Sequence, residues 1–272
     1  MQLRIGLSLV LGLTGALAWA QQPAGPAGAN APALFDKGRN ALSGSGASRN
    51  DLQAVEYFRR SADLGYAPAQ VVMGYFSDTG TLAPREPQQA ADWYRKAANQ
   101  GDRLGQWLLG RLYFFGIGVS RDLNQAQNWL KPAAEQGDPF AQYLLGRVKA
   151  EDANDYAAAA SWFRKSGEQG LPQAQARLGR LLKEGRGVPV DKYQAYVWLL
   201  LSFEQGNQSL DSELQQLETD LTSAQIEQAK TEVRKLQATV LREVAARGCT
   251  NWPGEFDELP APPPPKLQPF CR

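Results

Sequence analysis

Small and aromatic apolar residues recur at helical spacing through the middle of the chain. In each period an alanine stands three positions before an aromatic residue, and a glycine follows the aromatic residue by eight positions. Residues three apart share one face of a helix, and glycine is favoured just after a helix ends. Each period therefore predicts an amphipathic helix whose aromatic residue is expected in the core. The aromatic residues are Tyr57, Trp93, Trp129, Trp162 and Trp198, and the glycines are Gly65, Gly101, Gly137, Gly170 and Gly206.

Both series advance by 36, 36, 33 and 36 residues, so the chain is an array of similar units. A second helix is predicted earlier in each unit, where Ala-Gln or Gly-Gln precedes Leu-Gly or Met-Gly. A glycine in the middle of a helix costs about 1 kcal/mol relative to alanine. Its recurrence indicates that the neighbouring helix approaches closely there. These mid-helix glycines are Gly74, Gly110, Gly146 and Gly179.

The segments between the two helices of a unit carry turn and capping signals. Asp122 with Gln125, and Asp191 with Gln194, have the spacing of a helix N-cap and its N3 partner. Glycine-bearing loops precede both, at 116–119 and 185–188, but the fourth unit has Lys-Ala-Glu-Asp at 149–152 instead. The missing loop accounts for the 33-residue step.

A helix pair cannot bury its apolar faces alone, so an array of such pairs stacks. The pattern predicts an all-α fold, an α/α solenoid of stacked helix-turn-helix repeats with C-terminal capping helices. The array is predicted over residues 33–206 as about five units, the first of them degenerate. Capping helices follow at 207–248, and the second of them opens with a Thr222-x-x-Gln225 capping box.

The N-terminal end predicts export. Residues 1–20 contain Arg4, an apolar run and the small-x-small sequence Ala18-Trp19-Ala20, which is typical of a signal peptide cleaved after Ala20. The apolar run is shorter than the roughly 20 residues that span a bilayer. We therefore expect a periplasmic protein that does not insert into the membrane after cleavage. Residues 21–32, rich in Pro, Gly and Ala, are expected to be a disordered lead-in.

The C-terminal end, 249–272, is rich in proline and contains Cys249 and Cys271. In an oxidising compartment this pair favours a disulfide; a redox role is disfavoured because no Cys-x-x-Cys motif is present. The tail is expected to be a solvated extension. Two alternatives remain open: a ligand for another module, and an internal inhibitor that uses the acidic residues Glu255, Asp257 and Glu258.

Charge and composition disfavour several functions. Removal of residues 1–20 leaves 28 basic and 28 acidic residues, so the overall basic excess that a nucleic-acid binder needs is missing. The chain has no histidine, which removes the commonest general base and metal ligand. We expect no catalytic residues, no metal site and no cofactor.

The segments 93–98 and 162–165, each continuing to the next helix-ending glycine, resemble the Sel1-like repeats, which are relatives of tetratricopeptide repeats. The resemblance implies an adaptor, often for complexes in bacterial envelopes. Some secreted members of that family are linked to β-lactam hydrolysis. Those members have cysteines in each repeat, whereas this array has none, and no Ser-x-x-Lys motif is present. We therefore keep a β-lactam hydrolase only as a remote alternative.

The candidate binding surface is a stripe on the first helix of each unit. If these helices line the concave face, as in the related repeats, positions −3, +1 and +4 from the mid-helix glycine are expected to form one exposed aromatic and basic stripe. The alternative is that the aromatic residues pack between helices. The stripe residues we single out are Tyr75, Trp107, Arg111, Phe114, Tyr143, Arg147, Arg180 and Lys183.

Arginine beside aromatic rings suits a carboxylate-bearing ligand. The leading prediction is a periplasmic scaffold for an envelope protein or an acidic segment of one, acting in envelope assembly or signalling. The alternative is a protein that binds peptidoglycan or an exported polysaccharide.

Overall fold

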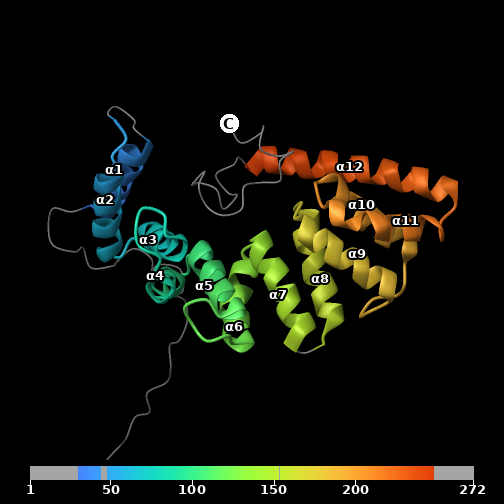
Figure 1. Cartoon of the computed structure of the whole chain (residues 1–272), viewed down its shortest axis with the longest axis horizontal. Coiled ribbons are helices and arrows are strands. Elements are labelled where there is room, and N and C mark those ends of the chain that lie inside the picture. The colour runs from blue at the N-terminus through green and yellow to red at the C-terminus, as the bar shows by residue number, and fades with distance from the viewer. Residues whose placement is uncertain (1–29, 44–47, 153, 248–272) are drawn as a thin grey trace, which may run out of the picture.

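The computed structural model describes residues 30–43, 48–152 and 154–247. Within these ranges the chain forms twelve α-helices and one short 3-10 helix, with no strand, as predicted (Figure 1). The predicted signal peptide, the tail and the Cys249–Cys271 pair lie outside the described residues. The helices are α1 (Ala31–Ser43), α2 (Asp51–Asp63), α3 (Ala67–Thr79), α4 (Pro87–Asn99), α5 (Arg103–Phe115), α6 (Leu123–Glu135), α7 (Pro139–Asp152), α8 (Tyr156–Glu168), α9 (Pro172–Glu184), α10 (Lys192–Glu204), η1 (Gln208–Leu210), α11 (Asp211–Glu218) and α12 (Ser223–Arg247).

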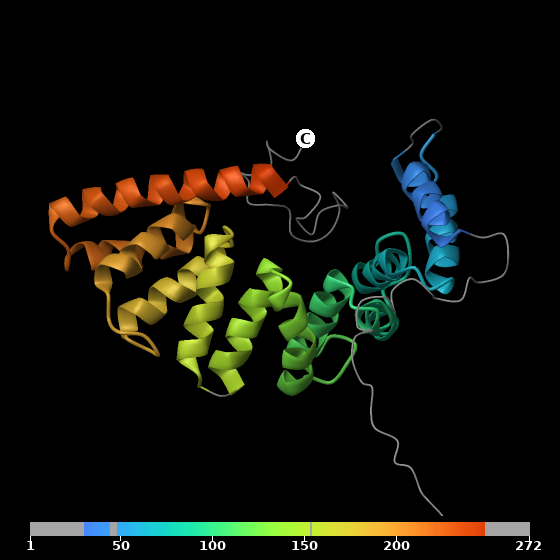
Figure 2. The same ribbon diagram turned by 180° about the vertical axis from the view of Figure 1, so that it is seen from behind.

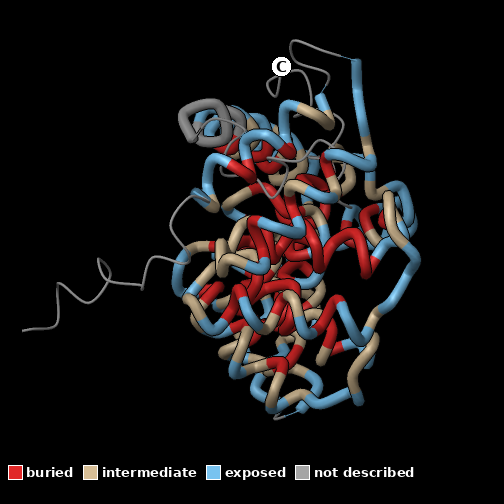
Figure 3. The backbone as a smooth tube through the Cα atoms, turned by 90° about the vertical axis from the view of Figure 1, so that its left-hand side faces the viewer, coloured by how far each residue is buried: buried red, intermediate tan, exposed pale blue. Residues whose placement is uncertain are grey.

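The helices pack in chain order along a curved row, which is the α/α solenoid that the repeats predict (Figure 2). Each unit is one pair of helices, from α1–α2 to α9–α10. The first helices of neighbouring units also contact each other, α3 with α5 and α5 with α7. They therefore form one continuous side of the array. The buried residues run through the interior of the row, between successive helices (Figure 3).

The mid-helix glycines are the points where the two helices of a unit meet. A Cβ at Gly110 would lie 2.6 Å from Leu130 Cγ, and one at Gly146 would lie 2.7 Å from Phe163 Cε1. Both distances are too short for real atoms, so a larger residue would force the helices apart. The predicted packing role of these glycines is confirmed.

The buried partner of each glycine is the residue just after the aromatic position. Phe163 is buried, whereas Trp162 is only partly buried, and the same holds for Trp93 and Trp129. Our expectation of a tryptophan core is wrong for these three residues. Of the four tryptophans in this series, Trp198 alone is buried, because α10 has further helices packed on it.

Lysine side chains cover two of the half-exposed tryptophans. Lys96 Nζ lies 3.8 Å from the ring centroid of Trp93, and Lys165 Nζ lies 4.3 Å from that of Trp162. Such cation–π contacts are worth about 0.5–1 kcal/mol at exposed sites. Lys96 and Lys165 therefore each shield a partly exposed tryptophan ring.

The recurring glutamine of the first helices links successive units. Gln142 Nε2 donates to the carbonyl oxygen of Ala134 in the preceding helix (3.1 Å), and its Oε1 accepts from Gln169 Nε2 (2.8 Å). These bonds satisfy polar groups at the buried joints between units. The same glutamine pair recurs as Gln70 with Gln100, Gln106 with Gln136, and Gln175 with Gln205.

The predicted helix caps are present. The side chains of Asp122 and Asp191 accept from the backbone N–H groups of Gln125 (3.0 Å) and Gln194 (2.9 Å). Thr222 and Gln225 form the full capping box, in which each side chain bonds to the backbone N–H of the other. In the fourth unit, the segment without the glycine loop continues as helix to Asp152.

The C-terminal helices cover the last unit, as predicted. Residues 195–202 of α10 are all buried, whereas an internal second helix such as α6 buries only one stripe. On α12, Ala229 and Val233 are fully buried, and Glu232 accepts a hydrogen bond from the hydroxyl of Tyr193 (2.8 Å). α11 and α12 thus replace the next unit of the array.

Candidate interaction surface

The predicted stripe is not one exposed surface. Tyr75, Trp107 and Phe114 are only 7%, 9% and 2% exposed. The structure therefore corrects the expectation that positions −3, +1 and +4 all face solvent. It bears out the packing alternative for these aromatic residues.

Helix geometry explains the correction. Each residue turns the helix by about 100°, so positions −3 and +4 lie only about 60° and 40° from the mid-helix glycine. They face the next unit: Trp107 packs on Phe140 of α7 with ring centroids 5.2 Å apart, and Phe114 lies under Arg147 of α7. On α5, α7 and α9 the residues turned further away, at +1 and +5, are the ones that reach solvent, whereas Tyr75 at +1 on α3 is buried.

Two of the three stripe arginines pair with a carboxylate on a neighbouring helix. Arg111 forms a salt bridge with Asp78 of α3, whose side chain is nearly buried. Arg180 contacts both carboxylate oxygens of Glu213 on α11, with Nη2 to Oε1 at 2.6 Å and Nε to Oε2 at 3.2 Å. This contact lowers the pKa of Glu213. These arginines join adjacent elements of the array.

Arg147 is held differently, because the corresponding neighbour in the preceding unit is Phe114 and not an acid. Its guanidinium lies 4.6 Å from the Phe114 ring centroid. Its carboxylate partner, Glu151, belongs to its own helix (Nη2 to Oε1, 2.9 Å). Glu151 also accepts from Arg121 Nη2 at 3.0 Å. One carboxylate therefore serves two guanidinium groups.

The two remaining predicted residues are partly buried. Tyr143 stacks against Phe163 with ring centroids 5.9 Å apart and contacts the apolar clusters on both sides of it. Lys183 joins Arg180 on Glu213 (Nζ to Oε2, 3.2 Å). Tyr143 thus packs between neighbouring units of the array. Lys183 joins the fifth unit to α11.

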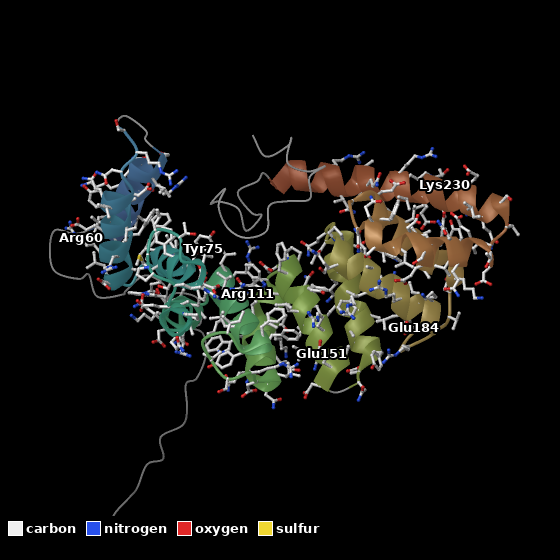
Figure 4. The ribbon with its side chains drawn as sticks, viewed as in Figure 1. Arg60, Tyr75, Arg111, Glu151, Glu184 and Lys230 are labelled. Carbon is white, nitrogen blue, oxygen red and sulfur yellow. The ribbon has the colours of Figure 1, made fainter. Side chains whose placement is uncertain are left out.

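The solvent-facing positions of the first helices form what we call the first-helix face. It consists of positions +1 and +5 from the mid-helix glycine on α5, α7 and α9, of position +5 alone on α3, and of the added position −2 on α9. Figure 4 labels Arg111, Glu151 and Glu184 on three successive first helices. The stripe chosen from the sequence missed position +5, although the spacing from the glycine identifies it. On α5, α7 and α9 the face comprises Arg111, Phe115, Arg147, Glu151, Arg177, Arg180 and Glu184.

One buried acid lies at the joint between units 3 and 4. Asp138 is 1% exposed, and its Oδ1 accepts from the backbone N–H groups of Phe140 (3.0 Å) and Ala141 (2.8 Å) at the start of α7. Its Oδ2 lies 3.8 Å from Arg103 Nε. Burial raises the pKa of Asp138 to about 6. Asp138 is therefore the N-terminal cap of α7.

In the described part of the chain, no group of three or more Asp, Glu, Cys or His residues could hold a metal ion. Among the helices of that part, none has the length and apolar character needed to cross a membrane.

Comparison with known proteins establishes the family. The Sel1 repeat model matches residues 32–66, 67–102, 104–138, 139–171 and 172–207. These ranges span more than half of the chain, which therefore belongs to the Sel1 repeat family. No curated protein matches it.

Two solved structures support the assignment. One is c5321, a protective antigen of uropathogenic Escherichia coli strains with an SLR fold: TM-score 0.72, 31% identity, 80% of this chain and 48% of that chain covered. The chain thus spans about half the length of c5321. The other is a Sel1 repeat protein from Oxalobacter formigenes: TM-score 0.64, 26% identity, 75% of this chain and 88% of that chain covered.

Proposed function

We propose that this protein is a periplasmic scaffold that binds a partner protein on its first-helix face. Sel1 repeat proteins generally mediate protein–protein interaction. The observation that carries the proposal is the continuous side formed by α3, α5 and α7, along which Arg111, Phe115 and Glu151 reach solvent. Repeat solenoids use such extended surfaces for binding.

The periplasmic location rests on the signal sequence at 1–20. Fractionation of cells that express the full chain, compared with a chain lacking these residues, tests it. The full chain is expected in the periplasm with its N-terminus at Gln21. Recovery of an uncleaved full chain from the cytoplasm would contradict export.

The binding proposal is tested by affinity capture from envelope extract with residues 21–272. A first-helix variant combines Phe115→Ser, Glu151→Arg, Arg177→Glu and Glu184→Arg, all at exposed positions. A control variant places four changes on exposed positions of the second helices, namely Asp92→Arg, Glu135→Arg, Arg164→Glu and Lys192→Glu.

A partner captured by the wild type and the control, and lost with the first-helix variant, supports the proposal. Capture that survives the first-helix variant would place the binding site elsewhere. Sedimentation with purified peptidoglycan, without capture of any protein, would favour the cell-wall alternative.

A further inference from the structure

Phe115 stands out on the first-helix face. It is 50% exposed, and it is the one aromatic residue among the exposed large apolar side chains of the described chain. The +5 positions of the other units hold Ser43, Thr79, Glu151 and Glu184, all polar. The third unit thus presents an aromatic ring to solvent where its neighbours present polar groups.

One guanidinium group lies near the Phe115 ring, and two lie near the adjacent Phe114 ring. The Arg147 guanidinium lies 5.8 Å from the Phe115 ring centroid and 4.6 Å from that of Phe114. Phe114 and Phe115 contact edge to face, with centroids 4.9 Å apart. The Arg121 guanidinium lies 5.9 Å from the Phe114 centroid, and its Nε donates to the Phe114 carbonyl oxygen at 3.1 Å. We call Phe114, Phe115, Arg121, Arg147 and Glu151 the Phe115 patch.

The patch has an unbalanced charge. Arg121 and Arg147 both contact Glu151, so two positive charges share one negative charge. On the same side of the array, Arg111 pairs with Asp78, and Arg180 and Lys183 also share one carboxylate, that of Glu213. The excess positive charge of the patch can attract a second carboxylate. The side chains of Arg121 and Arg147 are 54% and 23% exposed, so an incoming carboxylate can reach both guanidinium groups.

We infer that the Phe115 patch is an anchor point for a partner segment that places an acidic side chain next to an apolar one. The inference rests on the proposed function and names the partner's chemistry. The apolar side chain packs on the Phe115 ring, and the carboxylate accepts hydrogen bonds from Arg121 and Arg147. Aromatic residues and arginine are enriched at protein interfaces, and arginine–carboxylate bonds add directional specificity.

The patch is tested by fluorescence anisotropy with a defined probe, a labelled peptide containing Asp-Phe-Glu-Leu-Asp. The amide peptide Asn-Phe-Gln-Leu-Asn is the chemical control. The variants are Phe115→Ser and Arg121→Gln. Their matched controls are Val190→Ser, at an apolar residue 59% exposed in the loop after α9, and Arg164→Gln, at an exposed arginine of the second helix α8.

Wild type, Val190→Ser and Arg164→Gln are expected to bind the acidic peptide alike and more tightly than the amide peptide. Phe115→Ser and Arg121→Gln are each expected to weaken binding about tenfold, with the melting temperature checked for every variant. The inference is overturned by equal binding of the two peptides, by equal effects of Phe115→Ser and Val190→Ser, or by no binding of the acidic peptide at millimolar concentration.

The capture experiment separates this inference from the proposed function. Loss of the partner with Phe115→Ser alone supports both. If the partner is retained by Phe115→Ser and lost only with the fourfold first-helix variant, the scaffold stands and the patch is wrong. If the wild type captures no protein, the scaffold fails, and the peptide titration decides the patch independently.

Discussion

At the scale of the residue, the fold depends on contacts that leave no room for one extra methyl group. At Gly110 an added Cβ would lie 2.6 Å from Leu130 Cγ and 3.2 Å from the Leu130 backbone nitrogen. Leu130 is fully buried, so it cannot swing away into solvent. The helix preference for alanine, about 1 kcal/mol, opposes an overpacking cost of about 1–3 kcal/mol.

We predict that Gly110→Ala lowers the free energy of unfolding by about 1–2 kcal/mol, because the steric cost exceeds the gain in helix propensity. Urea denaturation measures the change. The control is the same substitution in a Leu130→Ala background, which removes the closest atoms. There Gly110→Ala is expected to be neutral or stabilising, and an equal loss in both backgrounds would contradict the packing explanation.

Asp138 makes the fold less stable as the pH rises, whereas a salt-bridged surface carboxylate makes a fold more stable as the pH rises. Its pKa is raised to about 6 by burial, against about 3.9 in the unfolded chain. The folded state therefore binds the proton more tightly. The stabilisation that follows is fully present below about pH 4 and is lost as the pH rises through 6.

We predict that Asp138→Asn removes this dependence, because asparagine also caps helices and does not titrate. Relative to wild type, the variant should gain stability between pH 4 and 7, by at most about 3 kcal/mol, the value for a shift of about two pKa units. Thermal melts across this range measure the difference. Asp122→Asn, at an exposed cap that also accepts from the backbone N–H three residues on, is the control, and a similar pH-dependent gain there would contradict the role of burial.

The sequence predicted the residues at which helices begin and end more accurately than the residues that reach solvent. A helix-ending glycine acts through its own backbone, and the side chain of a capping aspartate accepts from a backbone N–H three residues on, so the local pattern is sufficient to identify both. Trp107 and Phe114 were expected at the surface, yet they face α7. Their burial depends on how one unit is rotated against the next, and the sequence of a single repeat does not predict that angle.

At the scale of the element, hydrogen-bonded pairs of glutamines join each first helix to its neighbours. Gln175 is fully buried, its Nε2 donates to the Gly167 carbonyl oxygen (3.0 Å), and its Oε1 accepts from Gln205 Nε2 (3.0 Å). An apolar residue there would leave the Gln205 amide and part of the Gly167 carbonyl without a partner. Losing a buried partner costs about 1–3 kcal/mol.

We therefore predict that Gln175→Leu lowers the free energy of unfolding by about 2–3 kcal/mol. Gln173→Leu, at an exposed position of the same helix, is the matched control and is expected to change it by less than about 0.5 kcal/mol. Chemical denaturation followed by circular dichroism measures both. Comparable effects of the two substitutions would show that the hydrogen bonds of Gln175 do not stabilise the contact between units.

The helices themselves were largely predictable, because each unit repeats the same glycines, caps and apolar spacing. The fourth unit differs in a physically simple way. Its segment 149–152 was recognised as lacking a glycine loop, and the structure extends α7 through Asp152, one residue longer than the other first helices. Without a glycine to adopt a left-handed conformation at the usual place, the helix continues, and Asn154 takes a positive φ of 50° instead.

At the scale of the whole molecule, stability depends on closing the exposed end of the stack. The sequence predicted two capping helices from their apolar spacing, but not how far the second one reaches. α12 runs back beyond the last unit: Val240 Cγ1 would lie 2.6 Å from a Cβ at Gly170, in the turn between α8 and α9. Gln237 donates to Glu204 at the end of α10 (2.6 Å). One helix therefore covers parts of two units.

We predict that a chain ending at Asp220, which lacks α12, melts at a lower temperature and associates at high concentration, because the apolar surface of α10 around Trp198 becomes exposed. A chain ending at Arg247, which retains α12, is the reference for both measurements. Light scattering across a range of concentrations and thermal denaturation compare the two. Equal melting temperatures and equal masses at every concentration would mean that α9, α10 and α11 close the stack without α12; a loss confined to the shorter chain would show that this helix is the structural end of the array.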